Sequence, residues 1–235
     1  MTDTDPWVEL LVGDRPLLDR TSTVERVADV LRQRIIEGAL PPGTRLSEQD
    51  AGKALEVSRN TLREAFRLLV HERLLVHEFH RGVFVRVLSA EDVVDLYRIR
   101  RLLETGAVRH ADASKPERVA ALETAVHQGE LAAAESRWRD VGTANMLFHQ
   151  AVAGLAGSPR VDESMRQLLA ELRLAFHVMS RPKEFHEPYL ELNRSLAGLV
   201  AEGDLQETER KLNEYFDTAE TQLIEAYSQT TGRTT

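Results

Sequence analysis

The sequence predicts a mainly α-helical protein: an N-terminal winged helix-turn-helix followed by an all-α bundle of six or seven helices. Three observations support this prediction. Apolar residues recur at three- and four-residue spacing over most of the chain. β-rich runs occur only in residues 74–88, on either side of a turn that contains Gly82. After Ser89 no strand pattern follows, and glycine and proline separate the remaining helical segments.

The N-terminal pattern predicts three helices before the hairpin. The first begins at Thr21 and ends at the glycines and prolines of residues 37–43. The second covers about 47–55. The third, about 58–71, begins at Ser58, a good N-cap residue, and its apolar side chains predict one buried face. The residues that we expect on that face are Leu62, Ala65, Phe66, Leu69 and Val70.

Six further helices are predicted after the hairpin. Gly157-Ser158-Pro159, Arg181-Pro182 and Gly203-Asp204 lie at three of the breaks between them. The predicted helices cover about 90–111, 115–127, 129–156, 160–180, 185–202 and 204–228.

Charge distribution outlines three regions. The net charge is −8, of which residues 1–20 carry −3, residues 21–88 carry +2 and residues 89–235 carry −7. A small basic region therefore stands apart from an acidic remainder. We predict a flexible N-terminal arm over 1–20, a winged helix-turn-helix domain over 21–88 and an all-helical domain over 89–235.

Composition excludes several classes of protein. The chain has no cysteine, which excludes disulfides and thiolate metal sites and fits a reducing compartment. The acidic N-terminus has no apolar segment of the secretory type, and no apolar run approaches the roughly 20 residues of a membrane helix. We therefore expect a cytoplasmic protein with no membrane partner.

The third predicted helix carries a cationic stripe opposite its apolar one. Arg59, Arg63 and Arg67 are spaced four residues apart and share one face. In a helix-turn-helix the second helix of the motif enters the major groove, where Arg suits bidentate contact with guanine. The three arginines by themselves are equally consistent with a solvent-exposed helix face. The spacing of the predicted helices and the hairpin of residues 74–88, which would form the wing, favour DNA binding.

A stretch of about 55 residues resembles the N-terminal domain of GntR-type bacterial transcription regulators. The matching pieces are "I.EG.L.PG..LSEQ", "VSR..LREA.R.L" and "RG.FV". The resemblance implies binding to double-stranded operator DNA as a homodimer. The DNA contacts that we expect are Arg45, Gln49, Ser58, Arg59, Asn60, Arg63, Arg81 and Gly82. The chain departs from the family at Ala51-Gly52, where "LA" is usual, and at Glu56, where glycine is usual. We expect strain at Glu56 if its φ is positive.

The segment "DLYRIRRLLETGAVRHA" (95–111) resembles the first helix of the FCD effector domain, found in the FadR-like branch of these regulators. The resemblance implies a cavity that senses small metabolites, often carboxylic acids. Independently, polar residues interrupt the apolar stripes of several predicted helices, which indicates a shared polar cavity. Each could instead be satisfied separately in the core or at a boundary. The effector contacts that we expect are Arg100, Asn145, His149, Arg173, His177, Asn193 and Tyr215.

Many FCD domains hold a divalent metal with one Asp and three His. The resemblance places Asn145, His149, Asn193 and Tyr215 at these positions, so only His149 keeps a standard ligand. An amide is a weak ligand for Zn²⁺, and we expect no carboxylate nearby. We therefore expect no metal and no other cofactor, although His186 together with His177 could complete a site of different geometry.

An anionic ligand would then need a cation, and Arg100 with Arg173 could clamp a carboxylate. The function that we predict is a ligand-responsive DNA-binding transcription regulator, a repressor released by a small carboxylate-bearing metabolite. The alternative is a regulator whose helical domain only dimerises. An enzyme is disfavoured, because neither a nucleophile–base pair nor a Gly-rich phosphate loop is evident.

Overall fold

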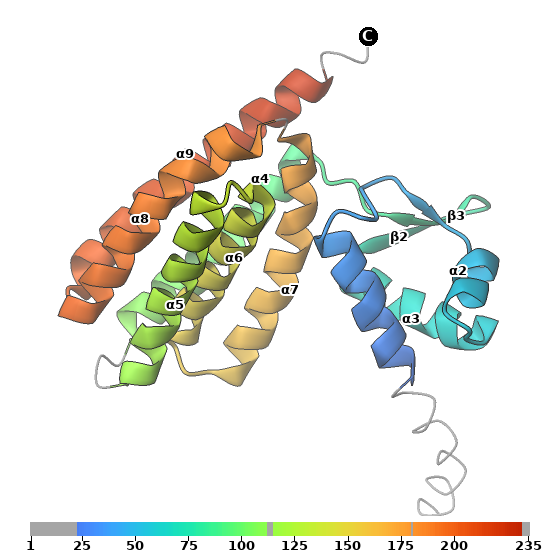
Figure 1. Ribbon diagram of the computed structural model, residues 1–235, viewed down its shortest axis with the longest axis horizontal. Coiled ribbons are helices and arrows are strands. Elements are labelled where there is room, and N and C mark those ends of the chain that lie inside the picture. The colour runs from blue at the N-terminus through green and yellow to red at the C-terminus, as the bar shows by residue number, and fades with distance from the viewer. Residues whose placement is uncertain (1–22, 112–114, 180, 232–235) are drawn as a thin grey trace, which may run out of the picture. The chain divides into compact units, whose positions relative to one another are not determined.

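The computed structural model describes residues 23–111, 115–179 and 181–231, and the chain divides into two compact units between Val87 and Leu88 (Figure 1). The predicted arm over residues 1–20 lies outside the described residues. The fold is mainly helical with one small sheet, as predicted. No helix among the described residues is long and apolar enough to cross a membrane.

The N-terminal unit is a winged helix-turn-helix. Its first helix covers residues 23–36. The remaining elements are β1 (Arg45–Leu46), α2 (Glu48–Ala54), α3 (Arg59–His71), β2 (Leu75–Glu78) and β3 (Gly82–Val85). The sheet is antiparallel with the order β1-β3-β2, and Phe84 pairs with Arg45 on one side and Val76 on the other. Strand β1 was not predicted from the sequence, because two residues are too few to show an alternating pattern.

Helix α3 packs its predicted apolar face into the core of this unit. Leu62, Ala65, Phe66 and Leu69 are buried, whereas Val70, also predicted in the core, is 36% exposed. Ser58 is the N-cap, as predicted, and its hydroxyl accepts a hydrogen bond from the Thr61 amide at 3.1 Å. This satisfies one of the amide donors at the start of α3 that have no partner within the helix.

The C-terminal unit is an all-helical bundle. Its elements are α4 (Ala90–Arg109), α5 (Pro116–Ala134), α6 (Trp138–Gly154), α7 (Pro159–Ala175), the 3₁₀ turn η1 (Phe176–Val178), α8 (Pro182–Glu202) and α9 (Leu205–Thr231). A capping box between Ser89 and Asp92 begins α4. Helix α6 packs against α4, α5, α7 and α8, so its side chains occupy the middle of the bundle.

One predicted helix boundary is wrong. The chain does not break near residue 128, because α5 continues through Gly129 to Ala134. A Cβ atom at Gly129 would lie 3.1 Å from Leu190 Cδ2, so this buried glycine serves the close approach of α8 rather than a turn. The turn comes instead at Ser136, which adopts a φ of 57° without glycine or proline to mark it.

Candidate operator-binding surface and effector cavity

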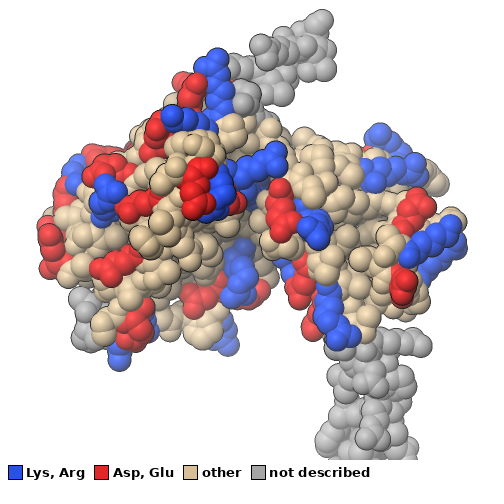
Figure 2. All heavy atoms as spheres, viewed as in Figure 1, with Lys and Arg blue, Asp and Glu red and all other residues tan. Residues whose placement is uncertain are grey.

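The exposed face of α3 carries the arginines that were predicted to contact DNA. Arg63 Nη2 lies 3.1 Å from Glu48 Oε2 on α2, and Arg67 Nη1 lies 2.7 Å from Glu64 Oε1. Arg59 is exposed and forms no ion pair with any described residue. Figure 2 shows basic and acidic side chains beside one another on the visible face of this unit. DNA phosphates would therefore compete with carboxylates for Arg63 and Arg67, but not for Arg59.

The other predicted DNA contacts form two groups. The first group is Gln49 on α2, Ser58 at the start of α3 and Asn60 in the first turn of α3, and all three are exposed. Arg45, Arg81 and Gly82 belong to the wing. Gly82 has a φ of 112°, and a Cβ atom there would lie 3.5 Å from Arg45 Nε. The wing turn thus requires glycine, and Arg45 lies beside it.

The turn between α2 and α3 contains a strained residue. Glu56 has a φ of 53°, in the left-handed region that glycine adopts without a steric penalty. This is the position where the resemblance expects glycine, and the positive φ meets the condition under which we predicted strain. The charged side chain is exposed, so the strain is confined to the backbone.

A buried hydrogen-bonded cluster lies inside the helical bundle. We call it the Arg100 cluster, and it consists of Arg100, Glu104, Asn145, His149, Asn193 and Tyr215. Arg100 Nε donates to Glu104 Oε1 at 3.0 Å, and His149 Nδ1 lies 2.6 Å from Glu104 Oε2. Arg100, Glu104 and His149 are each at most 2% exposed. One carboxylate therefore balances the charge of the buried guanidinium and orients the imidazole.

Glu104 belongs to the Arg100 cluster but is not among the effector contacts predicted from the sequence. We expected no carboxylate near His149, and that expectation is wrong. The spacing of Glu104 four residues after Arg100 on an apolar stripe was the available signal. The sequence did not show that α6 places His149 against the same carboxylate, because that contact depends on how the helices pack.

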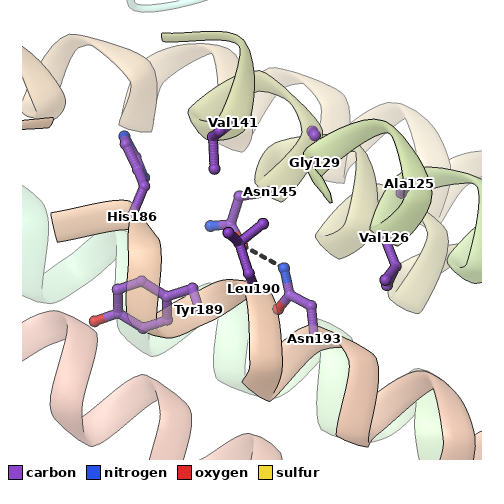
Figure 3. A pocket seen from close by; sticks show the side chains of 10 residues that line it. Ala125, Val126, Gly129, Val141, Asn145, His186, Tyr189, Leu190 and Asn193 are labelled. Carbon is purple, nitrogen blue, oxygen red and sulfur yellow. Dashed lines mark hydrogen bonds between the residues drawn. The ribbon is translucent and has the colours of Figure 1, made fainter. Parts of the chain in front are cut away.

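The four positions where the resemblance expects metal ligands do meet in space. Asn145 Oδ1 accepts hydrogen bonds from Asn193 Nδ2 at 2.7 Å and from the Tyr215 hydroxyl at 2.9 Å. Figure 3 shows Asn145 and Asn193 reaching toward each other from α6 and α8. The ring of His149 lies 4.9 Å from that of Tyr215 between centroids. Three helices thus bring these side chains to one place.

These residues do not fit a divalent metal. Burial raises the pKa of Tyr215 well above its usual value, so the phenol stays protonated and donates to Asn145. Asn145 Oδ1 is occupied by two donors, and His149 supplies one imidazole nitrogen. Among the residues that the structure describes, no group of three His, Cys, Asp or Glu side chains could hold a metal ion. The donor set is that of a hydrogen-bonded network rather than of a metal centre.

Three buried atoms of the Arg100 cluster have no hydrogen-bond partner among the described residues. They are Arg100 Nη2, His149 Nε2 and Asn193 Oδ1. Leaving a buried polar group unsatisfied costs about 1–3 kcal/mol, so each atom favours a polar occupant beside it. Burial also lowers the pKa of His149 and thereby favours the neutral imidazole.

Two small cavities adjoin the cluster, and Asn145 lines both. Arg100, His149 and Tyr215 line one, and Asn193 and His186 line the other, which Figure 3 shows. Each has a volume of about 10 Å³, roughly enough for one water molecule. A groove of about 310 Å³ along α8 and α9 is also lined by Tyr215. A larger ligand requires these side chains to move apart, and Tyr215 lies between the groove and the inner cavity.

Arg173 and His177 do not join the Arg100 cluster. Arg173 is buried, and its Nη2 donates to the Arg139 carbonyl at 3.3 Å. A Cβ atom at Gly142 would lie 2.9 Å from Arg173 Nη1 and 2.7 Å from His186 Nε2, so these two side chains cover the glycine. His177 is exposed. Helical spacing indicates which face of its helix a residue occupies, but not which residues of a neighbouring helix lie opposite it. The spacing therefore could not show that Arg173 and His177 lie outside the Arg100 cluster.

Comparisons with known proteins agree with this architecture. The family described as bacterial regulatory proteins, gntR family, matches residues 23–85, and the FCD domain family matches residues 95–218. The Nta operon transcriptional regulator of Aminobacter aminovorans is 31% identical over 162 residues, which cover 66% of this chain and 75% of that protein. The gluconate operon transcriptional repressor of Bacillus subtilis is 39% identical over 88 residues, or 37% of this chain and 36% of that protein.

A solved structure extends the likeness to both units. A GntR transcriptional regulator from Rhodococcus sp. RHA1 is 44% identical, with a TM-score of 0.83 over 88% of this chain and 99% of that one. Escherichia coli McbR/YncC, 22% identical with a TM-score of 0.73, shows the same fold. The chain is thus a DNA-binding transcriptional regulator rather than an enzyme, and it belongs to the GntR family of bacterial regulatory proteins, with an FCD domain as its C-terminal unit.

Proposed function

We propose that this protein is a repressor that leaves its operator when a small polar metabolite binds inside the FCD domain. The observation that carries this proposal is the Arg100 cluster. Two of its buried atoms, Arg100 Nη2 and His149 Nε2, have no hydrogen-bond partner among the described residues, and both residues line the same cavity. A helical domain that served only for dimerisation has no need of such a cluster, because an apolar core is more stable than a partly satisfied polar one.

Operator binding is proposed for the exposed face of α3 together with the wing. In this proposal Arg59 and Arg63 reach base edges or phosphates from α3, and Arg45 and Arg81 reach phosphate from the wing, which their exposure supports. Two copies would present two such surfaces to a pseudo-palindromic site. The molar mass in solution, measured by light scattering with and without operator DNA, tests the homodimer.

We propose that the FCD domain works without a bound metal, since two amides and a phenol stand where imidazole or carboxylate ligands are needed. Metal analysis of protein purified without chelator tests this. Stoichiometric Zn²⁺, Ni²⁺ or Mn²⁺ that survives dialysis contradicts it.

Two experiments test the regulator proposal as a whole. Selection of operator fragments from genomic DNA identifies the bound promoters and narrows the metabolite. A thermal-shift screen of metabolites then seeks a stabilisation that saturates with concentration, as binding to the folded state requires. The proposed release from the operator requires that the same compound weaken operator binding, and because coupling between two sites is reciprocal, operator DNA should weaken binding of the compound equally. Stabilisation without any change in operator affinity contradicts it.

A further inference from the structure

The hydrogen bonds of the Arg100 cluster determine which ring nitrogen of His149 carries a proton. What this implies for ligand binding rests on the effector cavity proposed above. Glu104 accepts from Arg100 Nε at 3.0 Å and lies 2.6 Å from His149 Nδ1. A carboxylate beside a buried guanidinium is ionised and can only accept hydrogen bonds. The hydrogen between Glu104 and His149 therefore belongs to Nδ1.

His149 Nε2 is consequently a hydrogen-bond acceptor. A neutral imidazole has one N–H and one lone pair, and the N–H is used toward Glu104. The ring is 1% exposed and packed among aromatic rings, with centroids 4.9 Å from Tyr215 and 5.9 Å from Phe216. This apolar surrounding disfavours a second proton on the ring. Nε2 thus offers a lone pair and requires a donor.

Arg100 Nη2 presents the opposite requirement, and Arg100 lines the same cavity as His149. This nitrogen is a buried donor without an acceptor among the described residues. The charge of Arg100 is already balanced by Glu104. A second carboxylate would therefore leave the cavity with a net negative charge and would direct its oxygens at the lone pair of Nε2. Both effects disfavour it.

A hydroxyl group that reaches both nitrogens satisfies them together, because its oxygen accepts from Arg100 Nη2 and its hydrogen is donated to His149 Nε2. We infer that the effector enters this cavity through an uncharged hydroxyl group, as a polyol does, and that the cluster rejects a carboxylate at the same place. This replaces the carboxylate clamp expected from the sequence. Specificity then comes as much from the unfavourable charge as from the new hydrogen bonds.

The tautomer of His149 is the first test and needs no ligand. Long-range ¹H–¹⁵N spectra of ¹⁵N-histidine-labelled protein at neutral pH distinguish the two ring nitrogens, and loss of the signal in His149→Phe assigns it. We expect a protonated Nδ1 and a bare Nε2. A proton on Nε2, alone or in addition to Nδ1, overturns the inference.

The second test uses matched probes on protein purified without glycerol. Calorimetric titrations compare glycerol with glycerate and xylitol with xylonate. We expect the polyol of at least one pair to bind about tenfold or more tightly than its acid, because a site built around a hydroxyl discriminates strongly against a group that leaves its atoms unpaired. His149→Phe should abolish polyol binding, and the exposed control His127→Phe should retain it.

The outcomes separate the inference from the proposed function. Tighter binding of the acids overturns the hydroxyl inference and leaves an effector cavity in place. Binding of neither class also contradicts the inference, whereas the proposed function then depends on the metabolite screen and on coupling to operator binding.

Discussion

Glu104 and His149, 45 residues apart in the chain, meet in the interior of the FCD domain with 2.6 Å between Oε2 and Nδ1. The other oxygen of the same carboxylate accepts from Arg100 at 3.0 Å. The Glu104 carboxylate therefore joins α4 to α6, balances a buried cation and holds the imidazole that lines the cavity.

Replacing Glu104 with glutamine should destabilise the FCD domain. The change removes the negative charge and leaves the Arg100 guanidinium, which is 2% exposed, without compensation. We expect a loss of about 3–5 kcal/mol in the free energy of unfolding, as for other buried pairs that lose one partner. Urea unfolding measures it. Glu214→Gln, which removes an exposed partner of Arg210, is the matched control and should leave the transition midpoint unchanged. Equal midpoints for both variants contradict the buried-pair interpretation.

Removing the arginines of α3 should weaken operator binding. Arg59→Ala or Arg63→Ala should raise the dissociation constant roughly tenfold to a hundredfold if the side chain contacts a base, and should relax specificity at that base pair. If it contacts a phosphate, the loss of affinity should be the same for all DNA sequences. The slope of the logarithm of the binding constant against the logarithm of the salt concentration should then fall in magnitude by about one. Fluorescence anisotropy with operator DNA at several salt concentrations distinguishes the two, with Arg166→Ala on α7 as a control. Unchanged isotherms for both arginine variants would remove them from the interface.

The ion pair between Arg63 and Glu48 gives a further prediction for the same surface. Because the two side chains lie 3.1 Å apart, binding of Arg63 to DNA has to break or share this contact. Glu48→Gln should therefore tighten operator binding when Arg63 is present. It should have a smaller effect on operator binding when it is combined with Arg63→Ala. A double-mutant cycle measures the coupling, and strictly additive effects show that Arg63 does not leave Glu48 to bind DNA.

Relieving the backbone strain at Glu56 should stabilise the N-terminal unit. With φ at 53°, glycine adopts this conformation without the steric penalty of a side chain. The greater freedom of glycine in the unfolded chain offsets part of the gain, so we expect Glu56→Gly to raise the melting temperature by a few degrees. Glu56→Ala retains the Cβ atom and should show no such gain. Equal melting temperatures for the two variants contradict the strain.

Stability should fall in mild acid because of His186. Burial, and next the charge of Arg173, lower the pKa of its imidazole to about 4, against about 6.5 in the unfolded chain. The unfolded state therefore binds more protons between these values, and stability present above pH 6.5 is lost as the pH falls toward 4. The loss should approach about 1.4 kcal/mol per pH unit. Urea unfolding between pH 7 and pH 4.5 measures it.

His186→Gln should show a shallower pH dependence over that range than wild type, because it lacks the titrating ring. The part that remains includes His149, whose pKa is lowered in the same direction. The exposed His127→Gln should follow the wild-type curve. Parallel curves for wild type and His186→Gln would show that the ring is protonated equally in both states.

Local chemistry made much of this protein predictable from its sequence. The apolar spacing of α3, the N-cap Ser58 and the glycine of the wing turn each act within a few residues, so the sequence alone predicts them. The departure at Glu56 was likewise visible, and its positive φ follows from the turn geometry. The wrong break near residue 128 arose because Gly129 has a packing role, and a packing glycine and a turn glycine look alike in a sequence.

What only the tertiary structure decided is the pairing of buried polar groups. The periodicity of each helix identified Arg100, Asn145, His149, Asn193 and Tyr215 as polar positions on apolar faces. It could not show how far along one helix the next one lies. That level is set by side-chain packing throughout the bundle, and it placed Glu104 against His149 and left Arg173 and His177 outside the cluster. The sequence by itself thus determined the family, the fold and the polar positions, whereas tertiary packing decided which charge each position faces and hence what the cavity can bind.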